Sequence, residues 1–163
     1  MRLSDGVEWG LHCAVLLAAL GDGGLPGRDL AAYHGVSESY LLKHLQALTR
    51  AGLLESVSGP RGGYRLARPA AEMTVLDVVE AIEGRQPAFR CSEIRQRGPG
   101  AIEDGRAYRR PCPINATMLA AEAARRDALR ARTIADLLAE IAGSADPRAL
   151  ERGAVWLGGR IRR

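Results

Sequence analysis

The sequence is short of aromatic residues, cysteines and long apolar runs, and each shortage excludes a class of protein. Its 163 residues include one Phe, and aromatic residues make up 4% of the chain. No apolar run approaches the roughly 18 residues that a membrane-spanning helix requires. Three cysteines, an odd number, argue against a secreted scaffold held by disulfides and leave metal binding, catalysis or packing as their roles. We therefore expect a soluble, helix-rich protein of the cytoplasm with no membrane partner.

The positive charge of the chain is distributed unevenly. The net charge is +4, yet residues 1–70 hold seven Lys and Arg against six acidic residues. Residues 85–113 hold seven Arg against three acidic residues. The total charge therefore supports a nucleic-acid partner only weakly, and the positions of the basic residues matter more.

Capping and turn residues divide the chain into predicted elements. The expected helices, each opened by a capping residue or proline and most of them closed by glycine, cover about 4–20, 26–34, 37–51, 74–83, 114–131 and 133–142. Two short strands flank the glycine-rich turn at 58–63. Residues 85–113 show no regular helical or strand periodicity and are expected to form a loop. Residues 144–163 carry no clear signal for a helix or strand.

Three helices followed by a two-stranded hairpin is the element order of a winged helix-turn-helix. The fold class is therefore mainly α with a small β-hairpin, and residues 1–84 form the winged helix-turn-helix domain. A tight link at Gly35 between the second and third helices fits the turn of that motif.

The third helix has a face suited to DNA. Leu41, Leu45 and Leu48 cluster on one side of a helical wheel and predict the core-facing stripe. The opposite side and its borders carry donors for phosphates and base edges: Ser37, Ser39, Tyr40, Lys43, Gln46 and Arg50. Because any surface helix has a polar face, the helix alone leaves both interpretations open.

The turn of the hairpin favours the DNA interpretation. Its tip places Arg61 beside Gly62 and Gly63, with Gly59 close by. A turn needs one glycine, so the additional ones indicate that backbone approaches a phosphate or enters a minor groove. Together, helix and hairpin predict binding to double-stranded promoter DNA.

Two side chains on the first helix are candidate metal ligands. Glu8 and His12 are four residues apart and project from one face, beside Leu11 and Val15. An acid and an imidazole next to apolar neighbours need a partner, since burying either alone is costly. A hydrogen bond between the two within the helix would meet this need as well as a metal would.

Two cysteines lie in the predicted loop. Cys91 and Cys112 are flanked by Arg90, Arg109 and Arg110, and cationic neighbours favour thiolate, the form that binds metal. Pro111 and Pro113 restrict the backbone around Cys112. Metal ligation, a reversible disulfide and two unrelated thiols all remain open. Cys13, among apolar residues of the first helix, is expected to serve packing.

The run AGLLESVSGPRGGYRLARP, followed by TVLDVVEAIEG, closely resembles the BadM/Rrf-type family of bacterial winged-helix regulators. The resemblance covers roughly residues 1–140. It implies a homodimer built on a long helix near 114–131, a third helix in the major groove and a wing at the flanking backbone. It also implies a cluster-binding loop at 85–113, a dimerisation helix with a final short helix at 114–143, and a tail at 144–163.

Many cluster-binding members of this family carry three closely spaced loop cysteines, and this sequence departs from that pattern. The segment VEWGLHC instead resembles redox-sensing members in which Glu and His join two loop cysteines around a [2Fe–2S] cluster. Matched position by position, the resemblance assigns those roles to Glu8, His12, Cys91 and Cys112. Trp9, between the first two, is the candidate for coupling redox state to the DNA-binding unit.

The sequence thus indicates a dimeric DNA-binding regulator that senses redox state through a [2Fe–2S] cluster. Our hypothesis is that Glu8 and His12 of one chain face Cys91 and Cys112 of the other. A zinc site with the same ligands, a Cys91–Cys112 thiol switch, and an adaptor that binds protein are the alternatives. An enzyme is not expected, because no glycine-rich cofactor motif is present and the residues after Cys112 are too few for a catalytic domain.

Overall fold

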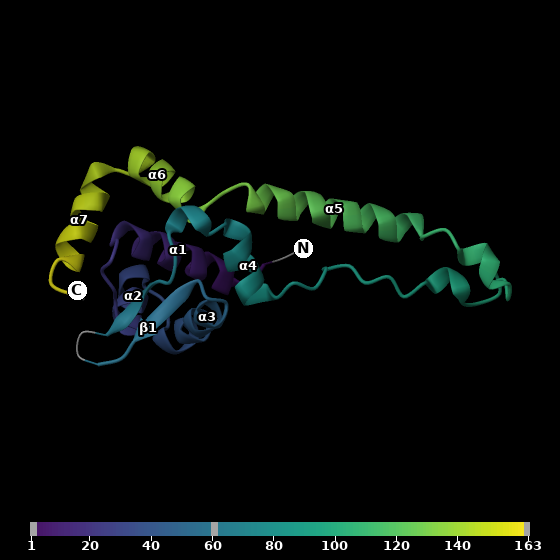
Figure 1. The fold of residues 1–163 in the computed structure, drawn as a ribbon, viewed down its shortest axis with the longest axis horizontal. Helices are drawn as coiled ribbons and strands as arrows, with labels where there is room; N and C mark the ends of the chain where they lie inside the picture. Colours follow the sequence, from purple (N-terminus) through teal and green to yellow (C-terminus); the bar gives the residue numbers. More distant parts are fainter. Residues whose placement is uncertain (1–2, 60–61, 162–163) are drawn as a thin grey trace.

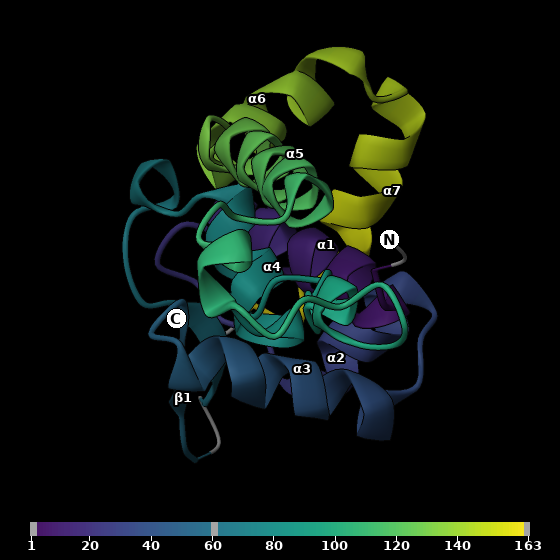
Figure 2. The same cartoon turned by 90° about the vertical axis from the view of Figure 1, so that its right-hand side faces the viewer.

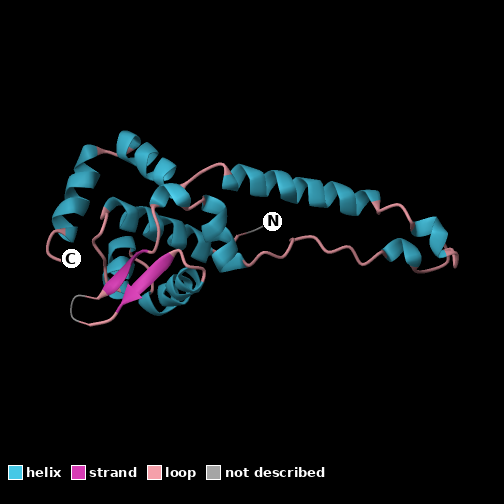
Figure 3. Ribbon diagram, in the orientation of Figure 1, coloured by secondary structure: helices cyan, strands magenta, loops and turns pink. Residues whose placement is uncertain are grey.

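The computed structural model describes residues 3–59 and 62–161, which form a rounded head carrying an extended arm (Figure 1). Two antiparallel strands are the only sheet among these residues, as the secondary-structure view shows (Figure 3). The elements in chain order are α1 (Asp5–Ala19), α2 (Gly27–His34), α3 (Glu38–Arg50), β1 (Leu54–Val57), β2 (Gly63–Leu66), α4 (Val75–Glu83), α5 (Pro113–Arg130), α6 (Ile134–Ser144) and α7 (Pro147–Leu157). The prediction of a mainly helical fold with a small hairpin is confirmed.

Helix α1 is the centre of the head. Its apolar residues occur on most sides of the helix, and it packs against α3, α4 and α6. Two glycines allow this close packing: a Cβ at Gly6 would overlap the ring of His44 on α3, and one at Gly10 would lie 2.6 Å from Ile82 on α4. The helix that carries Glu8 and His12 is therefore held rigidly against the DNA-binding unit.

Helices α2 and α3 form the predicted helix-turn-helix. Gly35 closes α2 with φ +66°, a left-handed conformation that glycine adopts without steric cost. Leu41, Leu45 and Leu48 of α3 are completely buried, so the core stripe is confirmed. The side chains of the opposite face of α3 are exposed.

The hairpin pairs β1 with β2 in antiparallel register, from Leu54 opposite Leu66 to Val57 opposite Gly63. Tyr64 also pairs through its backbone with Leu25, which ties the hairpin to the α1–α2 connection. A Cβ on Gly62 would overlap the carbonyl oxygen of Val57, and one on Gly63 would lie 2.6 Å from the Leu25 backbone. Both glycines are thus needed by the hairpin itself, and their number is not by itself a sign of DNA.

The first residues of three helices show how local sequence determines the caps. Thr74 and Thr133 each form a capping box with the acidic residue three positions later, as their spacing predicts. Ser4 occupies the N-cap position of α1 but makes no capping bond. Its hydroxyl instead donates to Glu83 at the end of α4 (2.5 Å), so this side chain joins two helices.

The arm consists of α5 and the returning loop, and Figure 2 shows it end-on above the head. No residue of α5 is buried, and Ile114, Met118 and Leu119 expose their apolar side chains. At its base, Arg126 forms an ion pair with Glu80 of α4 (2.5 Å), which fixes the arm to the head. No helix in the described part of the chain is both long and apolar enough to cross a membrane.

Helix α7 lies within the predicted tail and was missed by the sequence prediction. It packs onto the head through buried Leu157 and through Trp156, whose ring centre is 5.6 Å from that of Tyr33 on α2. The local signal for this helix is Asp146 followed by Pro147, where the carboxylate accepts the Arg148 N–H as an N-cap.

Candidate functional site

Glu8 and His12 lie side by side on the exposed face of α1. Both side chains are exposed, and they line a shallow depression together with Leu3, Val7 and Leu11. In the described part of the chain, no hydrogen bond or ion pair joins Glu8 to His12 or to any other side chain. The hydrogen bond within the helix, which the sequence left open, is absent here, so both donors remain available to a ligand.

His34 lies behind this pair on α2. Its ring centre is 5.7 Å from that of His12, and its Nε2 is buried without a hydrogen-bond partner among the described residues. Burial, with a smaller contribution from the nearby His12, lowers the pKa of His34 to about 4. His34 is therefore neutral near pH 7, so it adds no positive charge beside His12.

Cys91 lies on the loop of the arm and Cys112 directly before α5, and Arg95 is a cation near them, whose pKa is raised mainly by Glu93 and also by the two thiols. The Arg95 guanidinium donates to Glu93 Oε2 (2.6 Å) and to the Arg110 carbonyl oxygen (2.7 Å), and it lies over the Tyr108 ring (5.5 Å). The structure adds Arg95 to the flanking arginines that the sequence indicated.

The surroundings of the Cys112 thiol lower its pKa. The backbone N–H of Asn115, then that of Ile114 and the Arg95 guanidinium, lower the pKa of Cys112. These N–H groups belong to the first turn of α5, where the helix dipole favours negative charge. Burial does the opposite at Cys13 and raises its pKa to about 12. Cys13 is fully buried in the core, as its prediction as a packing residue required.

A single chain does not bring the four candidate ligands together. Among residues 3–59 and 62–161, no group of three or more His, Cys, Asp or Glu side chains is placed to hold a metal ion. Glu8 and His12 belong to α1 in the head, whereas Cys91 lies on the loop between α4 and α5 and Cys112 directly precedes α5 in the arm. The chain therefore presents two separate donor pairs, a carboxylate with an imidazole and two thiols.

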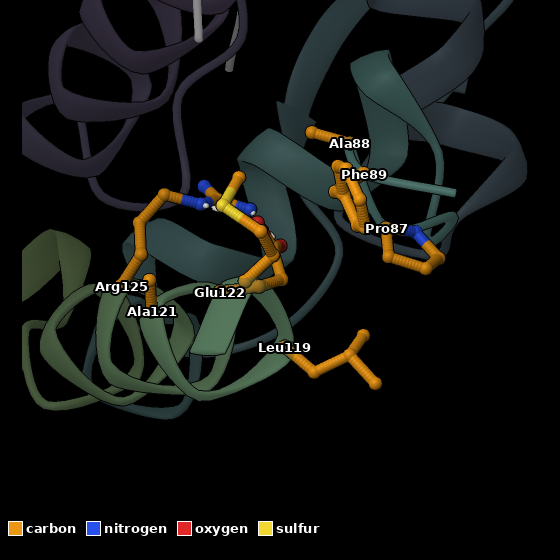
Figure 4. Close-up of a pocket in the computed structure, with 8 residues that line it drawn as sticks. Pro87, Ala88, Phe89, Leu119, Ala121, Glu122 and Arg125 are labelled. Carbon is orange, nitrogen blue, oxygen red and sulfur yellow. Dashed lines mark hydrogen bonds and ion pairs between the residues drawn. The ribbon is translucent and has the colours of Figure 1, made fainter. Parts of the chain in front are cut away.

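An apolar pocket lies on the arm between the loop and α5 (Figure 4). Pro87 and Phe89 form one wall, and Met118 and Leu119 of α5 form the other. Glu122 and Arg125 form an ion pair (2.6 Å) at its edge. The exposed apolar side chains of this pocket and of α5 make the arm a surface suited to burial against another protein.

The predicted DNA-contacting residues of α3 are all exposed. They are Ser37, Ser39, Tyr40, Lys43, Gln46 and Arg50. Ser37 is the N-cap residue, and its hydroxyl lies 3.2 Å from that of Ser39. Arg61 lies outside the described residues, whereas Gly62 is buried and Gly63 half-buried. The donors on α3 remain the principal candidates for contacts with bases and phosphates.

An aromatic cluster connects α1 with this face. The ring centre of Trp9 is 5.6 Å from that of Tyr40 and 6.2 Å from that of His44, in edge-on geometry. The Lys43 ammonium lies 5.3 Å from the Tyr40 ring centre. Trp9 follows Glu8 directly in the chain, so the contacts of its ring join this part of α1 to Tyr40 and His44 of α3.

Comparison with known proteins identifies the family. The Rrf2 family model, described as an iron-dependent transcriptional regulator, matches residues 3–140. The chain belongs to the Rrf2 family. Proteins of this family are transcriptional regulators and not enzymes. Protein aau3 of Rhizobium meliloti is 36% identical over 138 residues, which cover 85% of each chain. BadM of Rhodopseudomonas palustris, named as an HTH-type transcriptional regulator, is 41% identical over 83 residues, 51% of this chain and 53% of BadM.

Solved structures of Rrf2-type regulators show the same fold. The oxidised form of Staphylococcus aureus CymR is 27% identical, with a TM-score of 0.62 over 85% of this chain and 96% of CymR. IscR of T. potens is 22% identical, with a TM-score of 0.66 over 92% of this chain and 96% of IscR. The winged helix-turn-helix with its helical arm is thus the architecture of the family.

Proposed function

We propose that this Rrf2 protein is a homodimeric transcriptional regulator that senses redox state through a [2Fe–2S] cluster. Cys91 and Cys112 of one chain and Glu8 and His12 of its partner would hold the cluster. The observation that carries the proposal is that two complementary donor pairs, both accessible, lie on separate parts of one chain. Such an arrangement suits a site that is completed only by a second copy.

The chemistry of the four proposed ligands suits a [2Fe–2S] cluster. Thiolates are the usual ligands of iron–sulfur clusters, and the surroundings of Cys112 favour its thiolate. Glu8 and His12 are exposed and form no hydrogen bond or ion pair with another described side chain. A bound [2Fe–2S] cluster would supply reversible one-electron chemistry. Replacing two thiolates by a carboxylate and a neutral imidazole makes the site less negative, and its reduction potential would be higher than at an all-cysteine site.

The arm supports a shared site. Helix α5 has no buried residue, and its apolar side chains, such as Ile114 and Met118, have no cover within the described chain. A twofold symmetric dimer would bury these side chains and place the arm of each chain against the head of the other. In that arrangement the cysteines of one arm would approach the exposed Glu8–His12 pair of the partner's head.

Trp9 is the proposed link between redox state and DNA affinity. A change in the charge of the site acts first on Glu8 and His12, and Trp9 lies between them on α1 while its ring contacts Tyr40 and His44 of α3. A shift of the Trp9 ring would move Tyr40 and, with it, the Lys43 ammonium. This route joins the ligands to the residues that face DNA.

Replacing Trp9 with Leu is expected to uncouple the two functions. The variant should retain iron and sulfide and bind DNA, but the ratio of its DNA affinities in the oxidised and reduced states should approach one. The ratio for the native protein is expected to lie between about 5 and 150. Fluorescence anisotropy with a promoter duplex, on both redox states, measures it. Trp156→Leu, which removes the tryptophan of α7, is the control and should preserve the ratio. A Trp9→Leu variant with the full native ratio would refute this coupling route.

A thiol switch without metal is the second candidate. Cys91 and Cys112 both lie near the Arg95 guanidinium, and both contribute to the raised pKa of Arg95. Cationic surroundings promote thiolate attack and hence reversible disulfide formation. The two candidates differ in colour and in iron content, which a single preparation reveals.

A further inference from the structure

The segment from the start of α7 to residue 163 has the same net positive charge as the whole chain. Residues 147–163 contain five Arg and one Glu, a net charge of +4, and the whole chain also has a net charge of +4. The match to the family model ends at residue 140, before this segment begins. The basic charge is thus concentrated in a C-terminal segment that the match to the family model does not include.

This segment is packed onto the DNA-binding head. Leu157 is buried, Trp156 contacts Tyr33 of α2, and a Cβ on Gly153 would lie 2.6 Å from the Tyr33 hydroxyl. Beyond the helix, Ile161 reaches the α1–α2 connection, where a Cβ on Gly23 would lie 2.7 Å from the Ile161 side chain. The position of the segment on the head is therefore defined by its own apolar contacts.

This packing places Ile161, just beyond α7, against the α1–α2 connection, whose Leu25 pairs with the hairpin. Leu25, two residues after Gly23, exchanges backbone hydrogen bonds with Tyr64 of β2 (3.0 and 2.8 Å). Figure 1 shows α7 running from α6 along the side of the head towards the hairpin. Because the hairpin is the element that lies at the flank of the recognition helix, the end of α7 extends that flank.

Two arginines on this segment form no ion pair with another described residue. Arg152, Trp156 and Arg160 are spaced by four residues and share one side of α7 and its extension. The Arg160 guanidinium lies 4.1 Å from the Trp156 ring centre and donates to the Trp156 carbonyl oxygen (2.6 Å). No carboxylate among the described residues forms an ion pair with Arg152 or Arg160, whereas Arg148 is paired with Asp146 (2.6 Å).

We propose that Arg152 and Arg160 contact the phosphate backbone of DNA beyond the hairpin. A guanidinium that stacks on an aromatic ring is oriented in advance and keeps further N–H donors for phosphate oxygens. Such contacts are independent of base sequence and release counterions, so they strengthen binding in a salt-dependent manner. The inference rests on DNA binding by the winged helix and extends its footprint along the duplex.

The test compares the native dimer with the Arg152→Gln, Arg160→Gln double variant. Each protein is titrated onto random-sequence duplexes of about 40 and about 15 base pairs, and fluorescence anisotropy gives the DNA affinity over a range of salt concentrations. On the long duplex, the slope of log K against log[salt] should decrease by about 0.9 for each phosphate that the variant no longer neutralises, and affinity should fall at least about fivefold. On the short duplex, which lacks the flank, the two proteins should bind alike.

Arg148→Gln is the control for the loss of one positive charge from α7, because its guanidinium lies at the opposite end of the helix and is already paired with Asp146. It should leave the slope unchanged, and thermal unfolding should show that all variants fold. Native binding with an unchanged slope in the double variant would overturn this inference alone. Equal reductions in affinity on both duplexes would also overturn it, by placing the arginines within the main footprint. A native protein that bound neither duplex would instead contradict DNA binding itself.

Discussion

Replacing Cys112 with Ala is expected to abolish retention of iron and sulfide, together with the visible absorption of the protein. Cys112 is the thiol whose pKa is lowered by the N–H groups at the start of α5 and by Arg95, so its loss removes the ligand best prepared as thiolate. Because the side chain is not buried in the core, the fold should survive. Iron and sulfide assays on anaerobically purified protein, with circular dichroism as a check on folding, measure the effect.

Cys13→Ala is the matched control for this substitution. It removes the third thiol, which is fully buried in the core and has a raised pKa, so cluster content should stay at the native level. We expect the substitution to lower only the free energy of unfolding, by about 1 kcal/mol. If Cys112→Ala retained the native iron content, Cys112 would not be a ligand, and the proposed ligand set would be wrong.

The second large effect is expected from a mixed dimer of Cys91→Ala and His12→Ala chains. Neither variant alone should hold a cluster, because each homodimer lacks one ligand at both sites. In the mixed dimer with shared ligation, one site combines the intact cysteines of one chain with the intact Glu8 and His12 of the other. Its cluster content should therefore recover to about half that of the native dimer.

The same mixed dimer distinguishes shared ligation from ligation within one chain. If each site drew all four ligands from its own chain, every site in the mixed dimer would lack one ligand and no recovery would occur. Co-expression of the two chains with different affinity tags isolates the mixed species, and iron and sulfide assays then report the outcome. A mixed dimer of two Cys91→Ala chains with different tags is the control for the purification, and it should remain colourless.

Features that depend on near neighbours in sequence were predictable. The capping boxes at Thr74 and Thr133, the left-handed Gly35 and the leucine stripe of α3 all follow from spacings of four residues or fewer. The order of the predicted elements indicated the winged helix, and the resemblance to the family supported it and gave the long helix near 114–131 a role in dimerisation. Short-range patterns and a family motif therefore suffice for the architecture of the head.

Features that depend on tertiary packing were not predictable. The glycines of the hairpin indicated DNA, but Gly62 and Gly63 are explained by the approach of the backbone at Val57 and Leu25. The position of α7 is explained by its contacts with the head, through buried Leu157 and through Trp156 against Tyr33.

The candidate site was predictable only in part. The four ligands came from resemblance, whereas their division between head and arm is visible only in three dimensions. Arg95 was overlooked because the sequence shows which arginines are adjacent to a thiol and not which one folds back onto it. Here Glu93, the Arg110 carbonyl oxygen and the Tyr108 ring determine the position of its guanidinium.

The visible absorption spectrum of protein purified without air, with iron and sulfide assays on the same sample, tests the central claim most directly. The account predicts a red-brown protein with about two irons and two sulfides per chain, whose colour bleaches on reduction. A colourless protein that contains zinc or no metal would contradict the cluster, and Cys91 and Cys112 would then have to be tested as a zinc site or a thiol switch.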